Sequence, residues 1–225
     1  MNRFIVAIDG PSGAGKSTLA KRVAKEFGLT YLDTGAMYRA LALKVLRQRL
    51  DLADDLNLSE LVVSTEIDLI ARDGRVQVLL DGEDVSDLIR TPEVSQMASK
   101  VSALRIVRQR MLELQRRLGR KGSVVAEGRD MGTVVFPEAE VKVYLDASTE
   151  ERARRRFEEL RKAGRMVSLE ETLREMAERD KRDSERDLAP LRRAENAVVI
   201  DSSALDAQAV SERVIQAIRC KALEN

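Results

Sequence analysis

Histidine is absent from the 225-residue sequence, and cysteine occurs only once. Without histidine, the chain lacks the side chain that most often acts as a general base and most often ligates transition metals. A lone Cys220 excludes an intramolecular disulfide and a cysteine-rich zinc site, and it suits a reducing compartment. Chemistry in this chain must therefore rely on carboxylates, lysine, arginine and hydroxyl groups.

The sequence also lacks an excess of either charge, because it has 39 basic and 38 acidic residues and a formal net charge of +1. No global field draws the chain to nucleic acid or to an anionic membrane, so any phosphate binding must be local. Long apolar runs are missing too, since the first, at residues 4–8, is far too short for a signal or membrane segment. We expect a monomeric cytoplasmic protein without nucleic-acid or membrane partners.

The length fits one domain with a sizeable core. Short apolar runs without alternation, typical of strands buried on both faces, occur at residues 4–9, 124–126, 141–145 and 198–200. Amphipathic helical stretches separate them. These four runs predict an α/β fold in which helices flank a parallel sheet, and we expect that sheet to have five strands.

Residues 63–92 depart from this pattern. Apolar and polar residues alternate in EIDLIA and RVQVLL, with the turn dipeptide Asp73-Gly74 between them and a second one, Asp81-Gly82, after them. The segment is predicted to be a small antiparallel insert.

Residues 148–187 are predicted to form two charged helices. Ser148 and Ser168 each precede a glutamate by three residues, which is a capping-box pattern at a helix start. Helices over 148–162 and 168–187 would then be joined by a turn at Gly164, and Pro190 would end the second. We expect this segment to be a mobile lid.

Residues 10–17, GPSGAGKS, match G-x-x-x-x-G-K-[ST] between the first predicted strand and a helix predicted from Ser17 to Phe27. Such a P-loop holds phosphate oxygens on backbone N–H groups at a helix N-terminus, while Lys16 reaches the β and γ phosphates and Ser17 can ligate Mg²⁺. The expected ATP-binding residues of this loop are Gly10, Pro11, Ser12, Gly13, Ala14, Gly15, Lys16, Ser17 and Thr18.

A P-loop occurs in GTPases, motor ATPases and kinases. The guanine-reading N-K-x-D is absent, and the chain is short for a motor. Arg179, Asp183 and Arg186 have the spacing of one helix face, and Arg152 and Arg156 lie four apart on the preceding helix. Taken alone, such helices also fit a solvated surface with ion pairs. In a P-loop chain they favour a lid that brings positive charge to a transferring phosphoryl group.

Glu127, Gly128, Arg129 and Asp130 interrupt the apolar segment 124–135. They mark the end of a predicted buried strand, where open α/β sheets place their ligands. From the residues alone, Arg129 and Asp130 are better explained as a structural ion pair at a strand end.

Four segments, IDGPSGAGKS, YLDTGAMYR, AEGRDMGTVVFP and ERDKRDSERDLAPL, resemble those of bacterial cytidylate (CMP) kinases, which are nucleoside monophosphate kinases. The similarity covers nearly the whole chain, and GRDMGTVVFP with the R-D-x-R-D helix is its most specific part. The resemblance implies transfer of the γ-phosphoryl group of ATP to CMP or dCMP, which gives ADP and CDP or dCDP in pyrimidine nucleotide metabolism.

The resemblance also implies residue roles. The CMP-binding set is Thr34, Arg39, Ser99, Arg108, Arg129, Asp130, Arg179 and Asp183. Within it, Arg129 holds the acceptor phosphate, and Asp130 faces the cytosine amino group. The catalytic set that compensates the charge of the moving group is Lys16, Arg129, Arg179 and Arg186. Arg152 and Arg156 resemble an arginine pair that packs over the donor base and phosphates.

This assignment predicts a preference for cytosine. An ionised Asp130 accepts from the cytosine N4–H, with Arg108 and Ser99 donating to the ring acceptors, whereas uracil would turn O4 toward the carboxylate. Discrimination of about ten- to a hundredfold against UMP follows. The acceptor phosphate has a second pKa of about 6, so its oxygen is already ionised and no general base is needed.

Many relatives carry aspartate at the position of Glu127. We expect Mg²⁺, bound with ATP, to contact Ser17, and Asp33 or Glu127 through water. Two other functions remain open. A kinase for a hydroxyl acceptor would need a base such as Asp33. A nucleotide-dependent switch would show no acceptor-dependent turnover.

Overall fold

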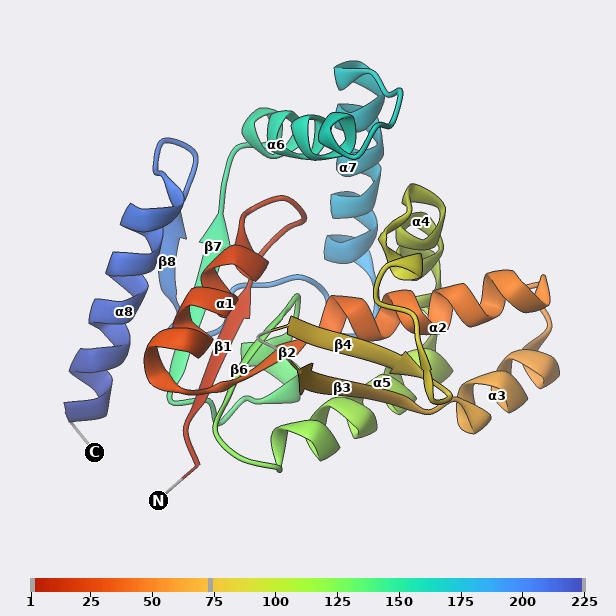
Figure 1. Ribbon diagram of the computed structural model, residues 1–225, viewed down its shortest axis with the longest axis horizontal. Helices are drawn as coiled ribbons and strands as arrows, with labels where there is room; N and C mark the ends of the chain where they lie inside the picture. The colour runs from red at the N-terminus through yellow and green to blue at the C-terminus, as the bar shows by residue number, and fades with distance from the viewer. Residues whose placement is uncertain (1–2, 73–74, 224–225) are drawn as a thin grey trace.

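A computed structural model describes residues 3–72 and 75–223, and its centre is a five-stranded parallel sheet (Figure 1). The strand order is β2-β6-β1-β7-β8, and each neighbouring pair is parallel. The strands are β1 (Ile5–Asp9), β2 (Thr30–Asp33), β6 (Val124–Gly128), β7 (Val141–Asp146) and β8 (Val198–Asp201). The predicted parallel sheet is confirmed. Periodicity alone did not locate β2, because only Tyr31 and Leu32 of its four residues are apolar.

Helices cover both faces of this sheet. The helices of the described residues are α1 (Lys16–Phe27), α2 (Thr34–Gln48), α3 (Asp55–Ser64), α4 (Pro92–Val101), α5 (Arg105–Gly119), α6 (Thr149–Lys162), α7 (Leu169–Glu185) and α8 (Ala207–Leu223), with short turns η1 (Leu88–Arg90) and η2 (Met131–Val135). Ile5 and Ala7 of β1 pack toward α2 and α5, whereas Val6 and Ile8 pack toward α1 and α8. Successive side chains of a strand point to opposite faces of the sheet, so the protein has two separate hydrophobic cores, one on each face. Among the described residues, no helix is both long and apolar enough to cross a membrane.

The predicted antiparallel insert is present as a three-stranded sheet of β3 (Ile67–Arg72), β4 (Arg75–Leu80) and β5 (Glu83–Asp84). Asp81-Gly82 forms the turn between β4 and β5, with positive φ at both residues. The predicted turn at Asp73-Gly74 lies outside the described residues. Ion pairs from α2 to Asp81 and Glu83, made by Lys44 and Arg47, hold the small sheet on that helix.

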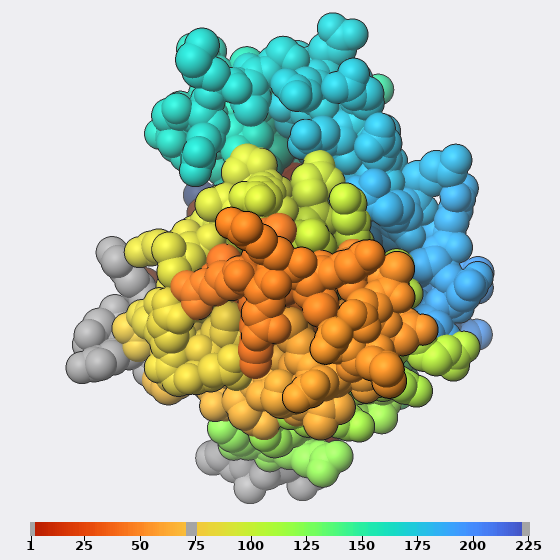
Figure 2. Space-filling model, turned by 90° about the vertical axis from the view of Figure 1, so that its right-hand side faces the viewer, coloured from red at the N-terminus to blue at the C-terminus, as the bar shows by residue number. Residues whose placement is uncertain are grey.

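Helices α6 and α7 form a hairpin at the top of the molecule (Figures 1 and 2). Both predicted caps are present, because Ser148 Oγ accepts from Glu151 N at 3.2 Å and Ser168 Oγ accepts from Glu171 N at 3.0 Å. Gly164 adopts φ 74° in the connecting turn.

The predicted end of the second helix was wrong. Helix α7 ends at Glu185, and the backbone of Arg186 is extended. The chain turns back there, because Leu191 N donates to Asp183 O at 2.7 Å, so Pro190 lies beyond the helix. Arg186 therefore does not lie on the helix face of Arg179.

The end of α5 gives a stability test. A Cβ on Gly119 would lie 2.5 Å from the Cζ of Phe136, whose ring is buried and cannot move aside. Gly119→Ala should lower the free energy of unfolding by about 1–3 kcal/mol, because overpacking outweighs the helix preference of alanine. Gly122→Ala, which has no atom within 4 Å of the new Cβ, is the matched control and should be neutral or slightly stabilising. Equal urea midpoints for the two variants would contradict this account of the packing.

Candidate active site

The glycine-rich loop passes from β1 into α1 at the carboxyl edge of the sheet, as its sequence predicts. Gly10 permits this path, since a Cβ there would lie 1.9 Å from the carbonyl oxygen of Leu145 on β7. The Lys16 side chain is buried, and its Nζ donates to Pro11 O at 2.6 Å. The loop therefore curls around its own lysine.

The charge of Lys16 is poorly compensated. Burial and the nearby positive charges of Arg129 and Arg179 lower its pKa to about 7, against the opposing effects of Glu127 and Asp9. An anion in the loop would restore the charged form of this lysine, because it would supply the missing negative charge.

One buried carboxylate, that of Asp183, serves three guanidinium groups. Arg129 Nε lies 2.9 Å from Asp183 Oδ2, while Arg186 Nη1 and Arg179 Nε lie 3.9 and 4.0 Å from Asp183 oxygens. Although burial opposes it, the positive charge of Arg129, with those of Arg179 and Arg186, lowers the pKa of Asp183. The predicted grouping of Arg179, Asp183 and Arg186 is therefore present in space.

The guanidinium groups remain incompletely satisfied. Arg179 Nε and Arg186 Nη2 are buried and have no hydrogen-bond partner within the described residues. Burial, followed by repulsion from Arg129, lowers the pKa of Arg179 to about 10. Buried donors without partners are costly, so the arrangement suits a bound polyanion.

Arg129 and Asp130 do not pair with each other but point to different partners. Arg129 pairs with Asp183, whereas Asp130 accepts a hydrogen bond from Arg108 of α5. Arg186 Nη2 lies 3.6 Å from the other oxygen of Asp130. Asp130, Arg108 and Arg186 therefore form a second charged centre, beside the first one around Asp183.

Ser99 of α4 is buried near this second centre. Its Oγ accepts from Arg182 Nε at 3.1 Å, and its carbonyl accepts from Ser102 Oγ at 2.9 Å. Arg108 Nη1 in turn donates to Ser102 O at 3.3 Å. Ser99 and Arg108 are thus linked through Ser102, on the same side of the site as Asp130.

At the end of β6, Glu127 accepts a hydrogen bond from the hydroxyl of Tyr31. Burial, then the charge of Asp33, raises its pKa, whereas Lys16, Tyr31 and Ser17 act in the opposite direction. Ser17 and Glu127 are thus adjacent oxygen donors. Among the described residues, no group of three or more histidine, cysteine or acidic side chains is placed to hold a metal ion.

The start of α2 contributes three predicted residues. Thr34 Oγ1 donates to Glu127 O at 2.6 Å, so it is fixed against the end of β6. Asp33 caps α2 by accepting from Ala36 N at 2.8 Å, and Arg39 Nη2 donates to its other oxygen at 3.2 Å. Both Asp33 oxygens are therefore occupied.

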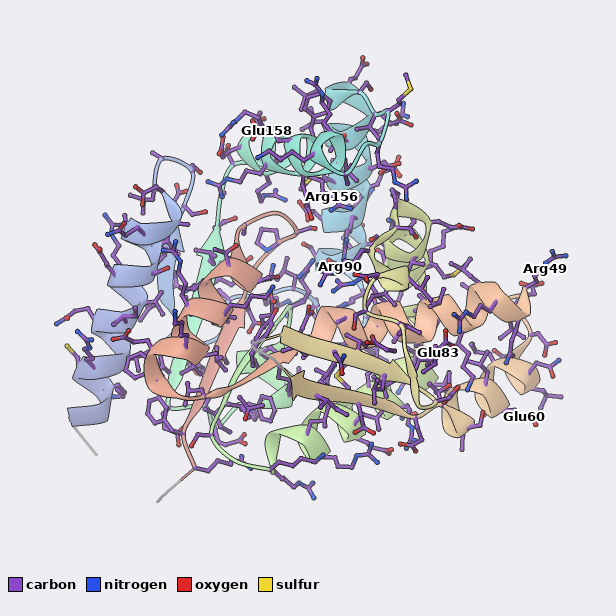
Figure 3. All side chains as sticks on the ribbon, viewed as in Figure 1. Arg49, Glu60, Glu83, Arg90, Arg156 and Glu158 are labelled. Carbon is purple, nitrogen blue, oxygen red and sulfur yellow. The ribbon has the colours of Figure 1, made fainter. Side chains whose placement is uncertain are left out.

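The two arginines of α6 have different surroundings. Arg152 is buried and donates to Ala147 O at 2.9 Å, Ser12 O at 3.1 Å and Asp180 Oδ2 at 2.5 Å, so it ties the P-loop to both helices. Arg156 pairs with Glu159 and lies on the side of α6 that faces the body of the molecule, whereas Glu158 lies on the outer side (Figure 3). Arg156 lines a cavity of about 50 Å³ between α6, α7, α4 and Ser12.

Several residues in these networks were not predicted as site residues: Asp9, Tyr31, Ser102, Asp180, Arg182 and Tyr38, whose ring centroid lies 5.9 Å from the guanidinium carbon of Arg108. Asp9 accepts from Met131 N and Gly132 N, each at 2.8 Å, and burial raises its pKa to about 6. Asp9 could have been predicted as a site residue, because it is the last residue of a predicted buried strand. Asp180 could have been found by its spacing, which puts it on the α7 face of Met176 and Asp183.

The parallel sheet, the P-loop and the buried cations around it define the class of P-loop kinases. A solved structure of an uncharacterized protein from Eubacterium ventriosum shares the fold, with a TM-score of 0.53 at 12% identity over 96% of this chain and 99% of that one. That likeness concerns the fold alone.

Sequence comparison then gives the family. The family model described as cytidylate kinase matches residues 6–220. Curated proteins named cytidylate kinase from Carboxydothermus hydrogenoformans and Bacillus subtilis are 50% and 48% identical, over 95% and 97% of this chain and 96% and 98% of theirs. The chain belongs to the cytidylate kinase family, and it is therefore a nucleoside monophosphate kinase. The resemblance seen in the sequence motifs is confirmed.

The pKa of Lys16 predicts how the protein exchanges protons when it binds a nucleotide. At pH 8 the empty protein holds Lys16 mainly uncharged, since its pKa is about 7. Bound phosphates should raise this pKa, so binding of ADP at pH 8 should take up about one proton. Calorimetric titrations in buffers of different ionisation enthalpy measure this uptake. Lys21→Met, a change of an exposed lysine on α1, should leave the uptake unchanged, and a titration without proton uptake would mean that Lys16 is already charged.

Proposed function

We propose that this protein transfers the γ-phosphoryl group of ATP to CMP or dCMP. The observation that carries the proposal is the pair of adjacent charged centres at the end of β6, where Arg129 faces Asp183 and Asp130 faces Arg108. One centre suits phosphates and the other suits a polar base edge. Arg129 and Asp130 are neighbours in the chain, so acceptor phosphate and base would be held by one rigid strand end.

Positioning and charge compensation account for the reaction. The P-loop N–H groups and Lys16 would hold the donor phosphates, with the Lys16 ammonium exchanging Pro11 O for a phosphate oxygen. Arg129, Arg179 and Arg186 would surround the moving group, and the N–H groups of the latter two that have no partner in the described structure would be satisfied by it.

The acceptor needs no general base. Its phosphate oxygen is already mostly ionised at pH 7 and can attack the γ-phosphorus directly, as the group leaves the β-phosphate oxygen of ATP. A hydroxyl acceptor would need a base, and Asp33, the candidate for it, has its oxygens engaged by Ala36 N and Arg39. A phosphate acceptor needs no such base.

Cytosine fits the second centre. Asp130 would accept from N4–H, while Arg108 and Ser99 donate to ring acceptors, and uracil would place O4 against the carboxylate. Thr34 and Arg39 would complete the acceptor side, with Asp183 and Arg179 at the pentose hydroxyls. Moderate discrimination against UMP follows.

Mg²⁺ fits the donor side as a cofactor bound with ATP. Ser17 and Glu127 are neighbouring oxygen donors, and oxygen is the ligand that this cation prefers. Ser17 would ligate it directly, and Glu127 or Asp33 through water. When bound, the ion would neutralise phosphate charge.

The α6–α7 hairpin is proposed to act as a lid. A cavity of about 50 Å³ that Arg156 and Arg179 line lies between this hairpin and α4, and movement of the hairpin away from α4 would enlarge it for the donor. Arg152 and Arg156 would then close over the donor, and the small antiparallel sheet would border the acceptor side. We further propose a monomeric cytoplasmic enzyme of pyrimidine nucleotide metabolism.

The proposal is tested by ADP production from ATP with CMP, dCMP, UMP, AMP and GMP presented separately. CMP and dCMP should give the highest kcat/KM, and UMP should be about ten- to a hundredfold lower because of the acceptor mismatch at Asp130. Equal rates on all five, or ATP consumption that ignores the acceptor, would contradict the proposal.

Two variants serve as controls for this panel. Asp130→Ala should lower kcat/KM for CMP much more than for UMP, since only cytosine loses a hydrogen bond. Lys16→Ala should abolish activity with both acceptors. A CMP to UMP ratio unchanged by Asp130→Ala would overturn the base-reading role of Asp130.

A further inference from the structure

Arg182 is the side chain of α7 that hydrogen-bonds to α4. Its Nε donates to Ser99 Oγ at 3.1 Å, and its Nη2 donates to Gln96 Oε1 at 3.3 Å. Figure 2 shows the α6–α7 hairpin resting on the segment that contains α4. Ser99 and Gln96 lie three residues apart and therefore share one face of α4. One guanidinium group thus spans two neighbouring positions on that helix.

The contact fixes the hydrogen-bonding role of Ser99. A guanidinium group has only donors, so Ser99 Oγ must accept from Arg182, and its hydroxyl hydrogen must point elsewhere. A hydroxyl that accepts from a charged donor is polarised and becomes a stronger donor itself. Ser99 is 3% exposed, which leaves little water to compete for that hydrogen.

Ser99 is part of the network that holds the second charged centre. Its carbonyl accepts from Ser102 Oγ, and Ser102 O accepts from Arg108, the partner of Asp130. Ser99 and the carboxylate of Asp130 therefore belong to one hydrogen-bonded network.

We propose that Arg182 is a positioning residue that sets base specificity by holding Ser99 as a hydrogen-bond donor. The inference rests on the proposed function, because it assigns the acceptor base to this site. Cytosine presents acceptors at N3 and O2, which match a donor at Ser99. Uracil carries a hydrogen on N3, so a fixed donor there opposes it. Arg182 adds a second discriminating contact to that of Asp130, without touching the base.

A double-mutant cycle between Arg182 and Ser99 tests the inference. We would measure kcat/KM and Kd for CMP and UMP in the wild type, Arg182→Ala, Ser99→Ala and the double variant. Each single change should lower the CMP to UMP ratio about tenfold. The loss should fall on KM and Kd for CMP and leave KM for ATP unchanged. The double variant should show no greater loss than either single one, because both changes remove the same contact.

Three further variants separate positioning from a structural role. Arg182→Lys keeps a charged donor that can reach Ser99 and should recover part of the ratio. Gln96→Ala removes the second contact of Arg182 and should leave the ratio unchanged, since Ser99 keeps its partner. Lys181→Ala changes the exposed neighbour on α7 and is the matched control for a lost positive charge. Circular dichroism establishes that each variant is folded.

The outcomes are distinguishable. If Arg182→Ala weakens CMP and UMP equally, or if its effect adds to that of Ser99→Ala, then Arg182 only holds α7 on α4 and the inference is wrong. A wild type that binds CMP selectively but forms no CDP would overturn the proposed reaction, and the Kd cycle would still decide the role of Arg182. A CMP kinase whose selectivity survives Arg182→Ala would overturn this inference alone.

Discussion

The site depends on a charge imbalance around one buried carboxylate. Asp183 faces Arg129, Arg179 and Arg186, and Lys16 lies close to two of these arginines. Three guanidinium groups therefore share this carboxylate, and the ammonium group of Lys16 adds a further positive charge beside them. The lowered pKa values of Lys16 and Arg179 follow from burial together with this repulsion. A bound polyanion would reduce the repulsion and raise both pKa values. The arrangement that destabilises the empty protein therefore favours the protein with a polyanion bound.

The fold brings these charges together at one edge of the parallel sheet. Parallel strands bring the P-loop and the end of β6 to one edge of the sheet, which is where open α/β proteins bind ligands. Asp9 fixes their relation, because its two oxygens accept from Met131 N and Gly132 N just after Asp130. Helix α7 contributes Arg179 and Asp183 to the site, and Arg186 follows directly after that helix. Rigid parts thus hold the acceptor side, and the hairpin completes the site.

The sequence predicted the parts of the site whose residues are close in the chain. The P-loop, both serine caps and four of the five parallel strands depend on local patterns, and the structure has them. Strand β2 was missed because its four residues give no clear period. The end of α7 was misplaced because Leu191 returns to Asp183, a contact between segments that no helix propensity describes.

Local sequence patterns could not predict which residues pair with the charged side chains of the site. Arg129 and Asp130 are adjacent, so an ion pair between them fits the sequence, yet they bind Asp183 and Arg108. Those partners come from α7 and α5, and their orientation is set by tertiary packing. The hydrogen bond between Arg182 and Ser99 could not be predicted either, since the two residues are 83 positions apart in the sequence. Family resemblance supplied expected roles, but the structure supplies the contacts through which these residues act.

Thermal unfolding of the wild type and of Arg179→Met, with and without inorganic pyrophosphate, tests the charge imbalance most directly. If the imbalance exists, Arg179→Met raises the Tm of the empty protein by about 2–4 °C per kcal/mol gained, because a half-buried and poorly compensated charge is removed. Pyrophosphate then raises the Tm of the wild type by more than that of the variant. An empty variant that unfolds at or below the wild-type temperature, with an equal response to pyrophosphate, would contradict the account.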